Sequence, residues 1–448
     1  MPRRTTEHSG MRPNIIFIVA DDLGYADLGC YGGRRADFGA VSPVIDQLAA
    51  AGLKLTQGYS NSPVCSPTRF ALMTGRYQYR LRGAAEEPIN SKSRGSTTLG
   101  LPPEHPTLPS LLQRAGYRTA LIGKWHLGYP PAFSPLRSGY DEFFGPMSGG
   151  VDYFTHCASS GAHDLYDGDS ERHTPGYLTD LFSRRAVDWI QRVGADAELP
   201  FFLSLHYTAP HWPWETRDDE AISASLHQRL FHLDGGNVET YRRMIHHMDE
   251  GIGWVMDALR QVGQVDNTLV VFTSDNGGER FSDNWPLVGG KMDLTEGGIR
   301  VPWIAHWPAV IAPGQTSEQL CMTMDWSATL LDAAGAAPDG AYPLDGMSLM
   351  PVLRDPGLQL ERALYWRMNH RGQRALRQGD WKYLRVDGHD YLFNLAQDAR
   401  ERANIAGAQP ERLQAMMKDW AEWHATMPPI PQDATISLGF GAKDMPQR

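Results

Sequence analysis

Polar side chains that could do chemistry follow four short apolar runs of the sequence. Asp21 and Asp22 come directly after the first run, and Asp275 and Asn276 come after the last. Three carboxylates and one amide oxygen are the ligands that hard cations such as Ca²⁺ and Mg²⁺ prefer. Either pair alone is more simply a strand-end turn, where Asp, Asn and Gly are common. Together at one sheet edge, they favour a site for a divalent cation.

Two other runs end in groups suited to an anionic substrate. Lys124 and His126 are two residues apart in "GKWHLG", so in an extended segment both side chains point the same way. A lysine and a histidine on one side suit the binding of an anion and a proton transfer. His211 lies between two prolines in "APHWP", which stiffen the loop around a candidate general acid. Each motif alone is weak, because single histidines and lysines are more often structural.

Three further residues complete the set of candidates. Lys291 follows a glycine pair in "GGKMDLTEGGIRVP", which could bring backbone close to a ligand, and Ser148 lies in the less distinctive loop "GPMSGG". Cys65, in "VCSPTRFALMTGR", has Arg69 four residues later. A thiolate beside three carboxylates is disfavoured, and calcium or magnesium is a poor partner for sulfur. An oxygen-bearing group at position 65 would suit the site better.

These residues require a scaffold that brings strand ends together. The four apolar runs are rich in β-branched and aromatic residues, as strands buried on both faces of a parallel sheet are. Segments with helical spacing alternate with them, which predicts a doubly wound α/β domain with its ligand beyond the carboxyl ends of the strands. The expected strands lie within 14–24, 117–128, 200–213 and 267–278, and the expected helices are 42–52 (with Ser42 as N-cap), 107–117, 179–193 and 241–263.

The pattern of apolar and polar residues changes after about residue 350. Residues 374–386 and 389–398 have the pattern of antiparallel strands, and a helix is expected over 411–425. A chain of 448 residues also exceeds the size at which one core usually stops growing. We therefore predict a catalytic α/β domain over 1–350 and a smaller α+β subdomain over 351–448.

Composition restricts the partners of the protein. A net charge of −10 argues against binding to nucleic acid or to an anionic membrane surface. The four cysteines follow no metal-ligand spacing and are too few for a disulfide framework. No apolar run precedes Asn14 as in a signal peptide, and none approaches the about 20 residues of a membrane span. A cytoplasmic protein is the expectation.

The stretch "CSPTRFALMTGR" is similar to the signature of the type I sulfatases, C-x-P-x-R followed by a T-G pair. Other matching segments occur in family order over nearly the whole chain. The resemblance implies an alkaline-phosphatase-like fold and an arylsulfatase-like enzyme that hydrolyses a small sulfate ester. In that family a maturation enzyme oxidises the cysteine, here Cys65, to Cα-formylglycine. The matching segments are "PNIIFIVADDLGYADLGCYG", "GYRTALIGKWHLG", "APHWP", "SDNGG", "GGKMDLTEGGIRVP" and "ALRQGDWKYL".

The resemblance also implies a role for each candidate. Arg69 would hold the hydrated formylglycine, and Lys124 and Lys291 would bind sulfate oxygens. His126 would help to break down the sulfated intermediate, and His211 would protonate the leaving alcohol. Ser148 takes roughly the place of a sulfate-contacting serine. The cation, usually Ca²⁺ with Mg²⁺ as the alternative, would be held by Asp21, Asp22, Asp275, Asn276 and the modified Cys65.

Two rival functions stay open at this point. One is hydrolysis of a phosphate or phosphonate monoester on the same scaffold, against which Asn276 argues, because relatives that favour phosphorus often have histidine there. The other is a cation-binding relative without catalysis, which would be expected to have lost some of the catalytic side chains. The substrate is an aryl sulfate or a sulfated sugar. Tyr153, Phe154 and His156 are expected to contact its ring, and Trp212 and Trp214 lie beside His211.

Overall fold

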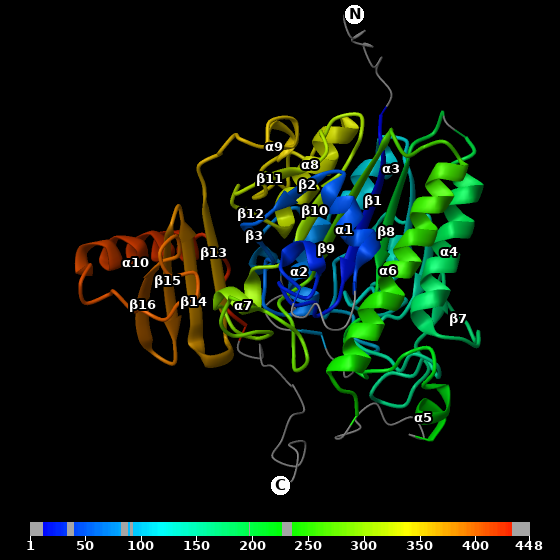
Figure 1. Cartoon of the computed structure of the whole chain (residues 1–448), viewed down its shortest axis with the longest axis horizontal. Coiled ribbons are helices and arrows are strands. Elements are labelled where there is room, and N and C mark those ends of the chain that lie inside the picture. The colour runs from blue at the N-terminus through cyan, green and yellow to red at the C-terminus, as the bar shows by residue number, and fades with distance from the viewer. Residues whose placement is uncertain are drawn as a thin grey trace, which may run out of the picture.

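The computed structural model describes residues 12–33, 40–81, 88–89, 93–196, 198–225 and 235–431. Its centre is a ten-stranded sheet, which the chain enters through its first strand (Figure 1). The four predicted apolar runs form adjacent parallel strands, each buried along nearly its whole length. They are β1 (Asn14–Ala20), β4 (Arg118–Gly123), β8 (Phe201–His206) and β9 (Thr268–Ser274).

Shorter strands extend the sheet on both sides, in the order β11-β2-β10-β9-β1-β8-β4-β5-β6-β7. The neighbour of β9 is antiparallel to it, so the sheet is mostly but not wholly parallel. A separate pair of short strands, β3 and β12, lies apart from the large sheet. The added strands are β2 (Leu53–Leu55), β3 (Gly58–Tyr59), β5 (Glu142–Gly145), β6 (Tyr166–Asp167), β7 (Ser170–Glu171), β10 (Trp303–His306), β11 (Gln315–Ser317) and β12 (Cys321–Met322).

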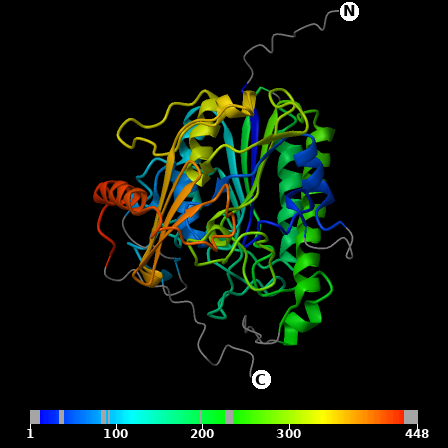
Figure 2. The same cartoon turned by 60° about the vertical axis from the view of Figure 1, so that its left-hand side comes forward.

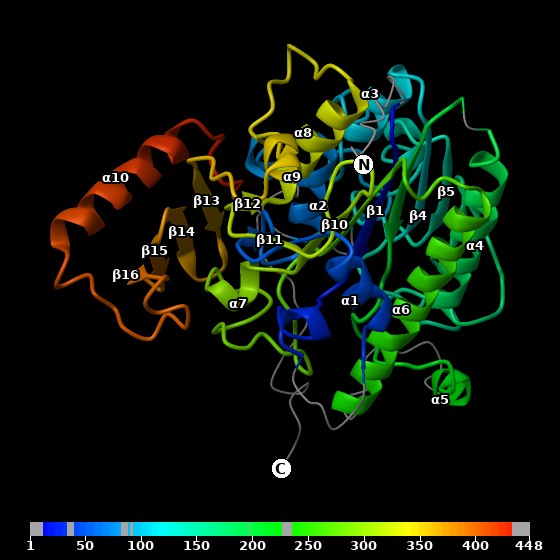
Figure 3. The same cartoon turned by 45° about the horizontal axis from the view of Figure 1, so that its top comes forward.

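Helices cover both faces of the large sheet, as predicted for a doubly wound domain (Figures 1 and 3). Alternate residues of β1 enter two different cores: Ile16 and Ile18 pack on one face, and Ile15 and Phe17 on the other. The first face carries α1 (Pro43–Ala50), α4 (Leu178–Val193) and α6 (Val238–Gln261); the second carries α2 (Cys65–Thr74), α3 (Leu108–Arg114), α8 (Thr323–Ala334) and α9 (Met350–Arg354).

Helix α1 begins after Ser42, as expected, but the serine hydroxyl does not cap it. That hydroxyl instead accepts from the Gly29 amide at 3.1 Å and donates to Asp46 at 3.1 Å. Helix α3 has a complete capping box, in which the Thr107 hydroxyl accepts from the Ser110 amide. The sequence therefore located these helix starts correctly but not every capping contact.

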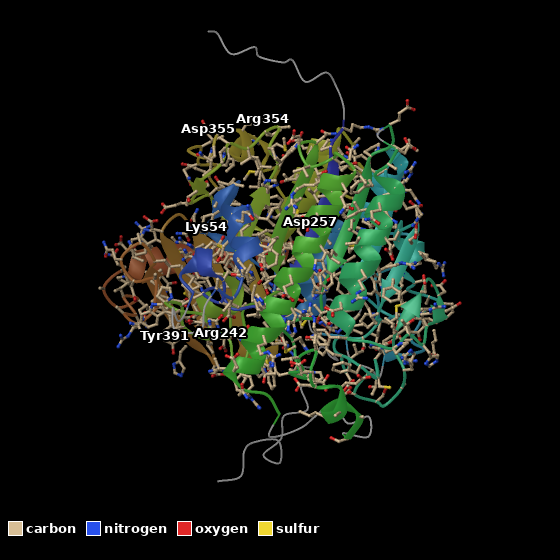
Figure 4. All side chains as sticks on the ribbon, turned by 45° about the vertical axis from the view of Figure 1, so that its right-hand side comes forward. Lys54, Arg242, Asp257, Arg354, Asp355 and Tyr391 are labelled. Atoms are coloured by element: carbon tan, nitrogen blue, oxygen red, sulfur yellow. The ribbon has the colours of Figure 1, made fainter. Side chains whose placement is uncertain are left out.

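Helix α6 is amphipathic along its 24 residues. Met244, Met248 and Ile252 are buried in the core of the first face, while Arg242 and Asp257 mark the outer side of the helix (Figure 4). Among the residues described, no helix has both the length and the apolar character needed to cross a membrane.

A four-stranded antiparallel sheet follows the large domain, with α10 (Pro410–Ala425) on its outer face (Figures 2 and 3). Met416 and Trp420 of α10 pack against this sheet. The strand and helix patterns expected after residue 350 are confirmed, whereas the domain boundary at 350 stays a prediction. The strands are β13 (Ala363–Met368), β14 (Gln373–Gln378), β15 (Trp381–Val386) and β16 (His389–Asn394). Two further short α-helices lie earlier in the chain, α5 (Glu220–Ser225) and α7 (Glu296–Ile299).

Candidate active site

The carboxyl ends of the four central strands meet at one edge of the sheet, toward the lower part of Figure 1. The register pairs Ala20 with Ser274 and Val19 with His206, so the residues that follow β1, β8 and β9 start side by side. Gly123, at the end of β4, pairs with the same histidine. This edge therefore gathers the polar side chains that follow all four runs.

An acidic cluster lies at the centre of this edge. Asp21, Asp22, Cys65 and Asp275 are buried, and each offers one ligand atom within 4.8 Å of the others. The Asn276 side-chain amide donates to Asp22 Oδ1 at 2.7 Å, which leaves its own Oδ1 buried without a hydrogen-bond partner among the described residues. A buried oxygen in this state is costly unless something else binds it. The donor set fits a divalent cation.

Each of the three carboxylates also faces a basic side chain. Lys124 Nζ lies 2.5 Å from Asp21 Oδ2, and Lys291 Nζ lies 2.6 Å from Asp22 Oδ2. Burial alone would raise the pKa of Asp22, but Lys291 and His211 overcome it and lower the pKa to about 2. The negative charges of the buried carboxylates are therefore compensated by buried basic side chains.

Arg69 forms the third of these pairs. Its guanidinium donates twice to Asp275 Oδ2, at 2.9 and 3.1 Å. Burial and then the neighbouring Asp21 raise the pKa of Asp275 to about 6, in spite of Arg69. Three acids within so small a space repel one another, and a cation would relieve that repulsion.

Cys65 is the first residue of α2, and Arg69 follows it by one turn. Its sulfur lies 3.5 Å from Asp21 Oδ1 and 4.0 Å from Asp22 Oδ1. Burial raises the pKa of this thiol well above its ordinary value. An unmodified Cys65 is thus a neutral and weak nucleophile, in agreement with the argument from sequence.

The two histidines of the site have distinct partners. His126 has a φ of 57°, its Nε2 donates to the Ile89 carbonyl at 2.6 Å, and its Nδ1 has no partner among the described residues. His211 Nδ1 donates to the Trp212 carbonyl, and its Nε2 lies 3.6 Å from Asp22 Oδ2. Burial and then the nearby lysines lower the pKa of both imidazoles, that of His211 to about 3. Both rings are neutral before substrate arrives.

The loop that contains Ser148 lies across these histidines. A Cβ added to Gly149 would lie 2.5 Å from His126 Cε1, and one added to Gly150 would lie 3.0 Å from His211 Cε1. Ser148 itself donates its amide to Asp164 Oδ2 at 2.8 Å and its hydroxyl to the Gly150 carbonyl at 3.3 Å. Its contact with sulfate stays a prediction.

Two of the residues expected to contact the substrate ring are buried instead. Tyr153 is 0% exposed, stacks on Tyr177 with ring centroids 5.4 Å apart, and donates its hydroxyl to the His211 carbonyl. His156 is also buried, and its Nε2 donates to the Gly176 carbonyl. For these two residues the expectation was wrong, because both rings pack inward, and Tyr153 supports the His211 loop. Contact of the half-buried Phe154 with the substrate stays a prediction.

Sequence reasoning also missed His206 as an individual candidate. Its Nδ1 lies 3.3 Å from Arg69 Nη1, and the same guanidinium nitrogen donates to the Lys124 carbonyl at 3.1 Å. His206 thus helps to orient Arg69. The signal that could have identified it is its position as the last residue of a buried strand. The last residues of β1 and β9 directly precede the acids of the site in the same way.

This buried edge of carboxylates, lysines, histidines and arginine, on a doubly wound sheet, defines a hydrolase of anionic esters. Residues 13–336 match the family model described as Sulfatase, and residues 290–423 match the model described as N-sulphoglucosamine sulphohydrolase, C-terminal. The chain belongs to the sulfatase family, and it is a sulfuric ester hydrolase. The family predicted from the motifs is confirmed.

Known relatives cover most of the chain. It is 33% identical over 377 residues to N-acetylgalactosamine-6-sulfatase of Mus musculus, which covers 79% of this chain and 68% of the relative. It is 33% identical over 464 residues to arylsulfatase A of Homo sapiens, covering 90% and 86%. The solved structure of Ps i-CgsB in complex with k-i-k-neocarrahexaose is similar with a TM-score of 0.83, at 31% identity and 96% coverage of both chains.

Proposed function

We propose that this protein removes sulfate from a sulfated sugar and releases inorganic sulfate. The observation that carries the proposal is the position of Cys65, buried among three carboxylates and within reach of the two site lysines. The names of two relatives support a sugar as the alcohol: one is an N-acetylgalactosamine-6-sulfatase, and the other is in complex with k-i-k-neocarrahexaose.

The acidic cluster would hold the divalent cation, which we propose is Ca²⁺. Asn276 would give it the buried Oδ1 that has no other partner, and the remaining ligands would be Asp21, Asp22, Asp275 and position 65. A maturation enzyme would first convert Cys65 to Cα-formylglycine. The ion and the oxidised side chain together would supply an oxygen nucleophile in place of sulfur and positive charge beside the sulfuryl oxygens.

The lysines would change partners when the substrate binds. Lys124 and Lys291 now neutralise Asp21 and Asp22. Once a cation binds these acids, it neutralises them in place of the lysines, and both ammonium groups can then bind the sulfate oxygens. Positioned charges in a dry site stabilise the charge that develops during sulfuryl transfer. Arg69, held by Asp275 and His206, would orient the side chain at position 65.

The two histidines would move protons on opposite sides of the reaction. His211 has its Nδ1 proton committed to the Trp212 carbonyl, so Nε2 would protonate the leaving oxygen. Its pKa is low in the free protein, and the negative charge of a bound sulfate ester would raise it. His126 has a free Nδ1, which would accept a proton from position 65 when sulfate departs.

A relative without catalysis is disfavoured, because none of the catalytic side chains is missing. The side chains that such a relative would lack are all present, and the structure brings them to one sheet edge with the acids: Arg69, Lys124, His126, His211 and Lys291.

Hydrolysis of phosphorus esters is tested by measuring the hydrolysis of 4-nitrophenyl phosphate beside that of 4-nitrophenyl sulfate. We expect the sulfate to be the better substrate.

The decisive experiment combines peptide mass spectrometry across residue 65 with assays of Cys65→Ser. We expect an aldehyde instead of a thiol in the active wild type and little or no sulfate release by the variant. Cys30→Ser, which changes a half-buried cysteine outside the site, is the matched control and should retain activity. Full activity of wild-type protein that carries an unmodified thiol would contradict the proposal.

A further inference from the structure

The loop that joins β9 to Lys291 carries an unusually exposed aromatic ring. Trp285 is 60% exposed, although most of the other tryptophans of the chain are buried or half-buried. An exposed indole contributes little to stability, because its apolar surface gains no free energy from burial. Such a ring therefore calls for an explanation in terms of what could cover it.

The backbone around Trp285 is firmly held. The Asp283 amide donates to Asp27 Oδ1 at 2.9 Å, and the Trp285 amide donates to Asp283 Oδ1 at 2.9 Å. Asn284 Nδ2 donates to the Gly289 carbonyl at 3.1 Å. The ring is presented on a braced loop rather than at a loose tip, so little order has to be gained when a ligand binds.

An arginine from the C-terminal part of the chain lies over this ring. The Arg400 guanidinium carbon is 4.4 Å from the Trp285 ring centroid. A second pair of the same kind involves the same loop, where Arg280 lies 5.4 Å from the Trp214 centroid. Neither arginine forms an ion pair with a residue that the structure describes.

Both pairs adjoin the catalytic site. The Lys291 backbone amide and Asn284 Nδ2 donate to the same acceptor, the Gly278 carbonyl, at 3.1 and 3.4 Å, so the neighbour of Trp285 is fixed to the segment that follows Asn276 and lies next to the backbone of Lys291. Trp214 follows His211 by three residues. The Trp285 pair is thus linked to the segment that follows Asn276, and the Trp214 pair to the loop that carries His211.

Indole faces and guanidinium groups together recognise a defined chemistry. The CH face of a sugar ring packs on tryptophan, and arginine binds sulfate or carboxylate through a planar fork of donors. We infer that Trp285 and Arg400 form a second subsite, which binds an anionic sugar next to the one whose ester is cleaved. The inference rests on the proposed function and adds that the substrate is a chain.

The test compares Trp285→Ala and Arg400→Ala with wild type on long and short substrates. The long substrates are hexasaccharides of carrageenan and of chondroitin 6-sulfate, and the short ones are the corresponding monosaccharide sulfates. We expect the ratio of kcat/KM for the hexasaccharide to that for the monosaccharide to fall about tenfold in each variant, mostly through KM. Added salt should reduce this ratio in wild type and have little effect in Arg400→Ala.

Arg412→Ala is the matched control. The Arg412 guanidinium carbon lies 4.1 Å from the ring centroid of Trp381, a half-buried tryptophan of the small sheet. The substitution therefore removes a similar pair outside the catalytic site. The inference is overturned if wild type shows no preference for the hexasaccharides or if both variants keep that preference. Loss of all sulfate release by wild type with an oxidised residue 65 would instead contradict the proposed function. Calorimetric titration of the hexasaccharides would then decide the subsite, since binding must weaken in Trp285→Ala.

Discussion

His126 shows how closely the backbone surrounds a functional side chain. Its own φ is in the left-handed region, which costs a non-glycine residue about 1–3 kcal/mol and persists only where the surroundings enforce it. The Ile89 carbonyl accepts from one ring nitrogen, and Gly149 lies directly against the ring. The imidazole therefore has one orientation, with Nδ1 free to accept a proton.

Gly149→Ala tests this orientation. The added methyl group would lie 2.5 Å from His126 Cε1, so the ring has to move, and we expect kcat to fall at least tenfold. Gly340→Ala is the matched control, because no atom lies within 4 Å of its added Cβ and its activity should equal that of wild type. Equal steady-state kinetics of the two variants would show that the ring orientation is unimportant.

His211→Asn tests the general acid. An alcohol leaving group needs a proton, whereas 4-nitrophenolate leaves readily without one, so the variant should lose much more activity on a sugar sulfate. We expect a loss of about 10²–10⁴-fold on the sugar and a clearly smaller one on 4-nitrophenyl sulfate. The comparison needs kcat/KM for both substrates. Identical losses would assign His211 to binding and not to proton transfer.

The loop after β8 and the segment before α4 are joined by a pair of buried acids. Asp152 accepts from the amides of Phe154 and Thr155, and Glu215 Oε2 accepts from the Tyr153 amide at 3.0 Å. Burial and then Asp152 raise the pKa of Glu215 to about 9. Glu215 is thus protonated at neutral pH, beside an ionised Asp152. This arrangement supports the segment whose tyrosine holds the His211 carbonyl.

Glu215→Gln should remove a pH dependence of stability. The unfolded glutamate has a pKa of about 4.3, so between that pH and about 9 the folded state binds more protons. The contribution of Glu215 to the free energy of unfolding is fully present below the unfolded pKa. It is lost as pH rises toward the folded pKa, by at most about 1.4 kcal/mol per pH unit. Melting temperatures from pH 5 to 9 should fall more steeply for wild type and for the exposed control Glu411→Gln than for Glu215→Gln. Parallel profiles would contradict the assignment.

The sequence predicted those elements whose pattern and length were strong. The runs that became β1 and β9 were predictable because burial on both faces requires continuous apolar residues. β10 has four residues and β6 has two, which is too short for a period to be visible. The position of the charged residues was predictable from the strand ends, whereas the roles of Tyr153 and His206 were not, because ring direction depends on packing between distant segments.

At the scale of the whole molecule, buried charges join the small sheet to the catalytic domain. Lys382 of β15 is 0% exposed, and its Nζ lies 3.0 Å from Glu296 Oε1 of α7 and 2.8 Å from Glu401 Oε1. Gln373 of β14 accepts from the Leu294 amide and donates to the Met292 carbonyl, both at 2.8 Å. The segment directly after Lys291 is therefore fixed by residues of the small sheet.

Lys382→Met should destabilise the protein strongly. It leaves two acids buried without their shared ammonium group, which typically costs about 3–5 kcal/mol of the free energy of unfolding. Lys418→Met is the control, because that lysine is exposed and its pair with Glu422 contributes about 0–1 kcal/mol. Denaturant unfolding of both variants measures the difference. A Lys382 variant as stable as the Lys418 variant would show that the buried charges do not hold the two parts together.

The link through Gln373 has a consequence for how the protein is made. The ribosome releases the helix that bears residue 65 early, together with the acids of the first strand. Lys291 emerges later, and the segment directly after it gains its contacts with Gln373 and Lys382 only when these two residues have also left the exit tunnel. A nascent chain thus carries residue 65 long before the segment after Lys291 has all of its contacts, and we expect the enzyme to become active only near the end of its own translation.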